Sequence, residues 1–171
     1  AAFAFIVITV LLDILAVGIV VPLLPKLIEG FVRGDTAKTA MIGGAFLMVW
    51  EGMQFLFSPL IGSLSDRFGR RPVLLLSNAG LSLDYVFMAL APTLGLLFIG
   101  RILSGITSSS FSTANAYVAD VVPAENRAKA YGMLGAAFGL GFVVGPAFGG
   151  YLGEISPRLP FWVAAALSGL N

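Results

Sequence analysis

Long apolar runs separated by short polar turns limit the possible folds of this sequence more than any other feature. An α-helix rises about 1.5 Å per residue, so about 20 apolar residues cross about 30 Å of hydrocarbon. No segment shows the alternating pattern of a membrane β-barrel. The sequence therefore predicts an all-α integral membrane protein, with spans at about residues 2–24, 39–61, 72–91, 94–119 and 130–152 and the start of a sixth at 161–171.

Composition excludes several classes of function. Only 11% of the residues are charged, against about 25% in a soluble domain. The absence of histidine and cysteine removes the usual zinc ligands, thiol nucleophiles and imidazole bases. We therefore expect no enzyme, no bound metal and no bound cofactor, and the net charge of +1 gives no reason to expect nucleic acid as a partner. Proton or cation chemistry would have to use carboxylates.

Four ionisable residues lie inside the apolar runs, where each costs roughly 2.5–3.5 kcal/mol at the bilayer centre. Counting along the helices from one side of the membrane places all four at depths of about 15–20 Å. Other polar residues follow them at spacings of three or four and therefore share their helix faces. We expect a polar mid-membrane pathway for protons and substrate, lined by Asp13, Glu51, Gln54, Asp84, Arg101, Ser104, Ser108 and Asn115.

The alternative is a closed bundle in which Arg101 pairs with one of the three acids. That arrangement leaves two carboxylates without a charged partner, and these would have to be protonated, hydrated or ligated. Carboxylates in such a place are suited to proton transfer.

A cluster of charge, GSLSDRFGRRPVLLL, separates the second apolar run from the third at residues 62–76. Asp66 and Arg70 have the spacing of a helical ion pair, and Pro72 suits the first turn of a new helix. A plain hairpin with its arginines among lipid headgroups would have the same composition. We expect instead a conformational latch in which Asp66 caps the following helix and Asp120 pairs with Arg70. Its residues are Gly62 and Gly69, which allow a tight turn, and Asp66, Arg67, Arg70, Arg71 and Asp120.

Glycine recurs throughout the fifth apolar run. The spacing of four between Gly141, Gly145 and Gly149 lets another helix approach closely. Pro146 should bend the helix. The glycines either serve tight packing alone or also provide a pliable contact along which the bundle rearranges. The predicted glycine helix comprises Gly135, Gly139, Gly141, Gly145, Pro146 and Gly149.

Motifs along nearly the whole sequence resemble the N-terminal half of a major facilitator superfamily transporter, specifically the tetracycline–proton antiporter group. The resemblance rests on LDILAVGIVVPLLP at 12–25, SDRFGRRPVLLLS at 65–77, SLDY at 82–85, GRILSGIT at 100–107, the glycine run at 135–150 and GEISP at 153–157.

The resemblance implies a twelve-helix transporter of two six-helix halves, of which this sequence is the first, with the C-terminal half absent. It implies export of a small amphipathic drug, tetracycline chelated to a divalent cation such as Mg²⁺, in exchange for protons by alternating access. It assigns Asp13, Asp84 and Arg101 to the pathway and Asp66, Arg70 and Asp120 to a charge cluster that holds the outward-open state. The implied partners are the lipid bilayer and the protein's own C-terminal half.

The resemblance also implies a bacterial inner membrane with the hairpin at 62–71 in the cytoplasm. Loop charges only lean towards this orientation, with five basic residues on that side and four on the other.

Two departures from the group's pattern leave open which drug is transported. Glu51 stands where the group usually has an apolar residue, and the run at 108–111, SSSF, is bulkier and more hydroxylated than the group's small-residue stretch. A multidrug or metabolite transporter, for example for sugars, remains an alternative on the same fold. A further alternative is a half-fragment that transports nothing.

Overall fold

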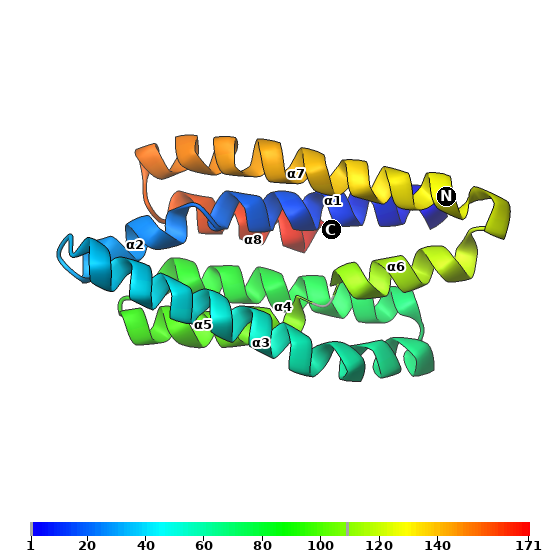
Figure 1. Ribbon diagram of the computed structural model, residues 1–171, viewed down its shortest axis with the longest axis horizontal. Coiled ribbons are helices and arrows are strands. Elements are labelled where there is room, and N and C mark those ends of the chain that lie inside the picture. Colours follow the sequence, from blue (N-terminus) through cyan, green and yellow to red (C-terminus); the bar gives the residue numbers. More distant parts are fainter. Residues whose placement is uncertain (1, 109) are drawn as a thin grey trace.

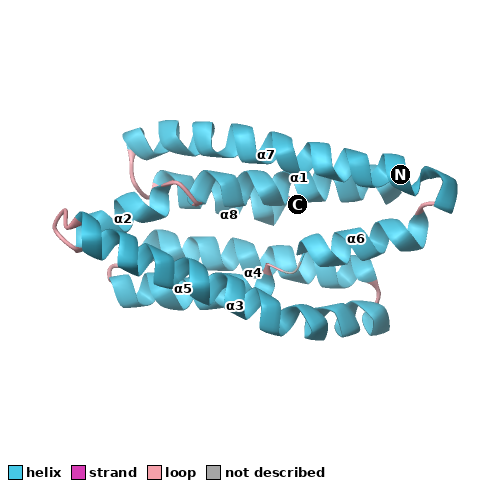
Figure 2. Cartoon of the chain, viewed as in Figure 1, coloured by secondary structure: helices cyan, strands magenta, loops and turns pink. Residues whose placement is uncertain are grey.

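The computed structural model describes residues 2–108 and 110–171, and nearly all of that part of the chain is helical (Figures 1 and 2). Within it, five segments are long and apolar enough to span a membrane: Phe3–Phe31, Thr36–Phe68, Arg70–Leu90, Leu94–Val121 and Ala124–Ile155. The all-α membrane fold is therefore confirmed. The helices are α1 (Ala2–Val20), α2 (Leu23–Phe31), α3 (Thr36–Phe68), α4 (Arg70–Leu90), α5 (Leu94–Thr107), α6 (Ser110–Val121), α7 (Arg127–Ile155) and α8 (Leu159–Leu170), with a 3₁₀ turn η1 (Ala124–Asn126) between α6 and α7.

The helices form an elongated bundle of two layers (Figure 1). One layer contains α1, α7 and α8, and the other contains α3, α4, α5 and α6. Contacts of α4 with α8 and of α1 with α6 join the layers. The apolar core between them includes Phe161 of α8 with Leu81, Tyr85 and Met88 of α4, all nearly inaccessible to solvent. Leu81 also lines the cavity described below.

Close approach of α7 to α1 depends on three glycines. A Cβ on Gly145 would lie 2.8 Å from the Cα of Gly18, and one on Gly141 would lie 2.6 Å from Cγ2 of Ile14. A Cβ on Gly149 would overlap the backbone of the same helix, α1. The packing predicted from the spacing of four is thus confirmed.

The remaining members of the predicted glycine helix lie elsewhere on α7. A Cβ on Gly135 or Gly139 would meet nothing within 4 Å. Gly139 and Gly141 are two positions apart, and each position turns the helix by about 100°. The two residues therefore point in nearly opposite directions. α7 continues as an α-helix through Pro146.

The segment between the first two predicted spans, at 25–38, is mostly helical. α1 ends at Val20, and α2 begins at Leu23 with Pro25 in its first turn, where proline is tolerated. The connection from α2 to α3 is short. It ends at Asp35, whose carboxylate accepts a hydrogen bond of 2.9 Å from the backbone N–H of Lys38 and so caps α3.

The charged hairpin is also shorter than predicted. α3 extends to Phe68, so Gly62 is helical and takes no part in a tight turn. Gly69 alone makes the turn to α4, with φ of 96°, a conformation that favours glycine. Pro72 lies in the first turn of α4, as predicted.

The predicted fourth span is interrupted in the middle. α5 ends at Thr107 and α6 begins at Ser110, with Ser108 as the residue that follows α5. The Thr107 hydroxyl donates to the carbonyl oxygens of Leu103 and Ser104, at 3.1 and 3.3 Å, and such hydroxyls compete with the helical backbone hydrogen bonds. Ser109, part of the departure noted at 108–111, lies outside the described residues.

Candidate functional site

A cavity of about 270 Å³ opens between α1, α3, α4 and α7. Four polar residues of the predicted pathway meet in its wall: Asp13, Glu51, Gln54 and Ser108. The rest of the wall is apolar and partly aromatic: Ile14, Val17, Trp50, Leu81, Phe138 and Phe142. This wall combines hydrogen-bonding groups and negative charge with aromatic surface, which is typical of a site for an amphipathic ligand.

Asp13 is the buried carboxylate of this wall, with 5% of its surface exposed. The side-chain amide of Asn171 donates hydrogen bonds of 2.9 Å to Oδ1 of Asp13 and 3.0 Å to the carbonyl oxygen of Thr9. Asn171 therefore ties the end of α8 to α1 at the depth of Asp13.

Sequence reasoning missed Asn171. A signal for it exists, because it follows Ser168 at a spacing of three, and Ser168 is a buried polar residue of α8. A polar stripe on α8 facing the bundle interior could have been predicted from that spacing.

Asp84 and Arg101 lie behind the cavity rather than in its wall. Both are nearly fully buried, at 3% and 5% exposure. Arg101 and Ser104 border a separate space of about 10 Å³, which shares Val17 and Trp50 with the cavity. Asp84, Arg101 and Ser104 therefore do not line this cavity together with Asp13, and their place in a proton pathway stays a prediction.

Arg101 forms no close ion pair in the described part of the chain. No carboxylate oxygen there lies within 4.0 Å of its guanidinium nitrogens. Nη2 lies 3.5 Å from the sulfur of Met88, and the Ser104 hydroxyl donates to the Arg101 carbonyl at 3.3 Å. The alternative of an acid paired directly with Arg101 is therefore not observed.

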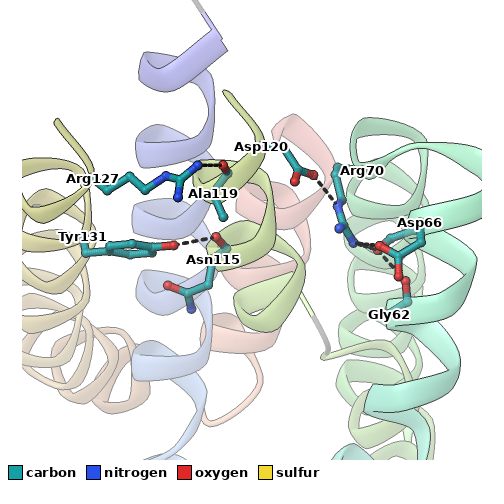
Figure 3. Close-up of polar contacts among 9 residues, drawn as sticks. Gly62, Asp66, Arg70, Asn115, Ala119, Asp120, Arg127 and Tyr131 are labelled. Atoms are coloured by element: carbon teal, nitrogen blue, oxygen red, sulfur yellow. Dashed lines mark hydrogen bonds and ion pairs between the residues drawn. The ribbon is translucent and has the colours of Figure 1, made fainter. Parts of the chain in front are cut away.

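The predicted latch is an ion-pair network centred on Arg70 (Figure 3). Its Nη1 lies 2.5 Å from Oδ1 of Asp66 and 2.6 Å from Oγ of Ser65, and its Nε lies 2.9 Å from Oδ2 of Asp120. The predicted pairing of Asp120 with Arg70 is confirmed. The network connects the α3–α4 turn to the end of α6, and its acids are more than half exposed, so each pair is weak and can be broken.

The predicted capping by Asp66 is wrong. The N-cap of α4 is Gly69, and no side chain donates or accepts a capping hydrogen bond there. Asp66 lies in the last turn of α3, which continues past the predicted boundary, and pairs with Arg70 across the turn.

Two other arginines of the predicted latch point elsewhere. The guanidinium carbon of Arg67 lies 5.4 Å from the ring centroid of Phe68, and that of Arg71 lies 5.4 Å from the ring centroid of Phe5. Both contacts have cation–π geometry. Arg67 and Arg71 therefore pack on aromatic rings beside the network.

Arg127, the first residue of α7, binds backbone carbonyls at the end of α6, and sequence reasoning did not single it out. It donates from Nη2 to the Ala119 carbonyl at 2.7 Å (Figure 3). It also donates from Nε to the Val122 carbonyl at 3.1 Å. On the same side of α6, the Tyr131 hydroxyl donates to the Asn115 carbonyl at 3.3 Å. Asn115 therefore lies near this contact of Arg127 with α6 and not in the cavity wall. A basic residue just after a helix end, near its free carbonyls, is the signal that could have identified Arg127.

No group of three or more acidic side chains within residues 2–108 and 110–171 could hold a metal ion. Asp13 and Glu51 are the carboxylates available to a positively charged ligand in the cavity wall.

Comparisons with known proteins place these features in a family. The sequence matches the model described as Major Facilitator Superfamily over residues 6–171. It is 48% identical over 163 residues to the class C tetracycline resistance protein of Escherichia coli, a match that covers 95% of this chain and 41% of that protein. It is 33% identical over 155 residues to Multidrug resistance protein 1 of Bacillus subtilis, a match that covers 90% of this chain and 39% of that protein.

The fold agrees with these matches. The solved structure of the human organic anion transporter MFSD10 superposes with a TM-score of 0.83 at 27% identity, covering 99% of this chain and 45% of that one. The chain thus spans about two fifths of the length of the curated relatives it matches.

Proposed function

The chain belongs to the major facilitator superfamily, and from that premise we propose that it forms the N-terminal half of a drug exporter that exchanges tetracycline for protons. The observation that carries this proposal is the buried carboxylate of Asp13 in the wall of a mid-bundle cavity. A membrane interior tolerates such a group where it faces protein or a hydrated pathway, and there it marks the route of a proton or ion. Identity to tetracycline resistance proteins over most of the chain supports the choice of drug.

Protons would bind at two places in this mechanism. Asp13 lies in the wall of the substrate space, whereas Asp84 is buried outside that wall. Protonation of Asp84 would remove the charge that offsets Arg101 and so change the relative stability of two packings of α4 and α5. A proton can drive a conformational change only through such a difference between states.

The Arg70 network would work at the cytoplasmic end of the cycle. It holds α6 to the α3–α4 turn through exposed ion pairs, which can form in one conformation and separate in the other at small cost. In this proposal the chemistry takes place in the cavity, and the network affects how fast the two conformations interchange.

The substrate would travel as a chelate with a divalent cation such as Mg²⁺. The metal is then cargo, and its positive charge would complement Asp13 and Glu51. The protein's own C-terminal half would close the open side of the cavity. This half and the lipid bilayer are the expected partners, and analogy with the Escherichia coli relative supports the bacterial inner membrane as the location.

A multidrug transporter is the second candidate. The match to Multidrug resistance protein 1 and the presence of Glu51 favour it, since a second carboxylate widens the range of positively charged ligands. Neither a sugar transporter nor an inactive fragment is favoured by a specific feature of the cavity.

The test is drug uptake into inverted membrane vesicles that contain the full-length protein. We expect tetracycline to accumulate when a proton gradient is imposed and to leak out when the gradient is collapsed. Tetracycline uptake that does not depend on the proton gradient would exclude proton exchange. Gradient-driven uptake of several unrelated drugs would support the multidrug alternative.

A further inference from the structure

Helix α8 is joined to α4 by hydrogen bonds at two levels. In the middle of α8, the carbonyl oxygen of Ala165 accepts a hydrogen bond of 2.8 Å from the Ser82 hydroxyl of α4. Just before α8, Arg158 donates from Nη1 to the carbonyl oxygen of Ala89 at 2.6 Å and from Nη2 to that of Ala91 at 2.9 Å. These carbonyls lie at the C-terminal end of α4, where backbone acceptors lack partners within the helix.

Close packing along α8 adds to these hydrogen bonds. A Cβ on Gly169 would lie 3.1 Å from Oγ of Ser82 and 3.8 Å from its Cβ. Nearer the start of α8, Phe161 belongs to the same apolar core as Tyr85 and Met88 of α4. The contacts with α4 therefore extend from the residue before α8 almost to its end.

The end of α8 is attached to α1 instead. Asn171, which directly follows α8, donates to Oδ1 of Asp13 at 2.9 Å and to the carbonyl oxygen of Thr9 at 3.0 Å. Figure 1 shows α8 beside α1 in one layer of the bundle and α4 in the other. α8 thus connects α4 to the carboxylate in the cavity wall.

Asp84 and Ser82 lie on different sides of α4. They are two positions apart, and each position turns the helix by about 100°, so they point in nearly opposite directions. Asp84 faces α5, because a Cβ on Gly100 would lie 3.3 Å from Oδ1 of Asp84. One turn earlier, a Cβ on Gly80 would lie 2.7 Å from Cγ2 of Thr107, which is also in α5. α4 therefore has a buried carboxylate on its α5 side and the attachment of α8 on the other.

We propose that α8 is the mechanical link between the two buried carboxylates, and that Ser82 and Arg158 are positioning residues of this link. The inference rests on the proposed function, in which α4 and α5 repack when Asp84 binds a proton. A shift of α4 against α5 carries α8 along, and Asn171 passes the displacement to Asp13. A helix of 12 residues transmits such a shift because its backbone hydrogen bonds make it stiff. Proton binding and movement of the cavity wall then occur in one step.

Disulfide cross-links test which helices move together. Residues 1–171 contain no cysteine, and any cysteine in the C-terminal half of the full-length protein is first replaced by serine. Ser82→Cys with Gly169→Cys joins α4 to α8, since a Cβ separation of 3.8 Å suits a disulfide. Gly80→Cys with Thr107→Cys joins α4 to α5, at a Cβ separation of 3.4 Å. Both pairs are oxidised in inverted vesicles, and a maleimide reagent measures the free thiols that remain.

The two cross-links should have opposite effects on proton-driven tetracycline uptake. In the reduced Ser82→Cys, Gly169→Cys protein we expect kcat to be about fivefold low, because a thiol is a weak hydrogen-bond donor. Oxidation should restore kcat, since the disulfide replaces the lost hydrogen bond between α4 and α8. Oxidation of the Gly80→Cys, Thr107→Cys pair should abolish uptake until the pair is reduced, because α4 can then no longer shift against α5.

Single substitutions separate a link from a merely structural contact. Ser82→Ala should lower kcat about fivefold and leave KM within about twofold, whereas Ser82→Thr, which keeps the hydroxyl, should recover most of the rate. Arg158→Lys should also lower kcat, because an ammonium group lacks the fork that reaches two carbonyls. Ser63→Ala is the matched control, since the exposed Ser63 hydroxyl bonds only the Leu60 carbonyl of its own helix.

A double substitution tests the connection through α8. Ser82→Ala combined with Asn171→Leu should have a kcat no lower than the lower of the two single variants, because both break the same link. Multiplied losses would overturn the inference.

Tetracycline binding to each variant shows that the protein is folded. Loss of uptake when the α4–α8 pair is oxidised, full uptake when the α4–α5 pair is oxidised, or failure of either pair to join overturns the inference. In these cases the unmodified protein still takes up tetracycline, and the proposed function stands. If the unmodified protein shows no proton-driven uptake, the proposed function fails and the inference fails with it.

Discussion

The side-chain amide of Asn171 donates a hydrogen bond of 2.9 Å to Oδ1 of Asp13. The same nitrogen donates to the Thr9 carbonyl, one helical turn away on α1. With both of its protons used, the amide fixes one oxygen of the Asp13 carboxylate and therefore its orientation in the cavity wall. The Asp13 carboxylate is thus positioned by a residue 158 positions away in the sequence.

Replacing Asn171 by leucine should raise the apparent KM for tetracycline about tenfold with a smaller change in kcat, because a hydrogen bond to a charged group contributes about 1.5–3 kcal/mol. The measurement is initial uptake into inverted vesicles. In an Asp13→Asn background the same substitution should have little further effect, since it acts through Asp13. Additive effects of the two substitutions would contradict this role.

Asp84→Asn should abolish proton-driven uptake and leave tetracycline binding within about twofold of the unmodified protein. Asp84 is buried outside the cavity wall, so losing its charge removes a proton site without removing a ligand contact. Uptake and equilibrium binding are measured on the same preparation. Glu154→Gln, an exposed acid near the end of α7, is the control. Normal proton-driven tetracycline uptake by Asp84→Asn would show that Asp84 is not a proton site of the transport cycle.

Asp66→Asn should slow uptake about tenfold and spare drug binding. The substitution removes one of the two ion pairs of Arg70, at a distance from the cavity. It should therefore change the rate at which the two conformations interchange and leave the drug-binding cavity unchanged. Arg67→Gln is the control, because Arg67 packs on Phe68 outside the network. Equal losses of binding and uptake would show that the network is not a latch.

Gly145→Val should lower the thermal unfolding temperature, with a cost of about 1–3 kcal/mol from overpacking. Its first added carbon would lie 2.8 Å from the Cα of Gly18, and backbone cannot move aside cheaply. Gly139→Val is the matched control on the same helix, because a Cβ there meets nothing within 4 Å. The readout is thermal unfolding in detergent. Equal shifts for both variants would contradict the α1–α7 contact.

The Asp35 cap predicts that the stability of the first turn of α3 depends on pH. The backbone N–H of Lys38 and its side chain lower the pKa of Asp35, so the cap stabilises α3 above the ordinary pKa of an aspartate and is lost as pH falls through the lowered pKa. Amide hydrogen exchange at Lys38, corrected for its intrinsic pH dependence, should show protection falling in that acidic range. Asp35→Asn, which caps without titrating, should remove the pH dependence.

Much of the fold and part of the site follow from patterns along single helices. The lengths of the apolar runs determine the spans, because an apolar helix must cover the thickness of the hydrocarbon. The pairing of Asp120 with Arg70 follows from two turns on one side of the membrane, and the α1–α7 contact follows from the spacing of Gly141, Gly145 and Gly149. In each case the geometry is local or repeats along one helix.

Tertiary structure alone decided which charges face the cavity. The depth of Asp84 can be counted from its helix, but its burial outside the cavity wall depends on how α4 and α5 rotate and pack against their neighbours. Asn115 lies beside Tyr131 and outside the cavity wall, and no pattern within one helix placed Asn171 beside Asp13. A sequence determines how far along its axis a helical residue lies, whereas rotation about that axis is set by side chains on other helices. For that reason the sequence by itself predicted a belt of charge, and packing separated it into a cavity wall with Asp13 and Glu51 and a buried region with Asp84 and Arg101.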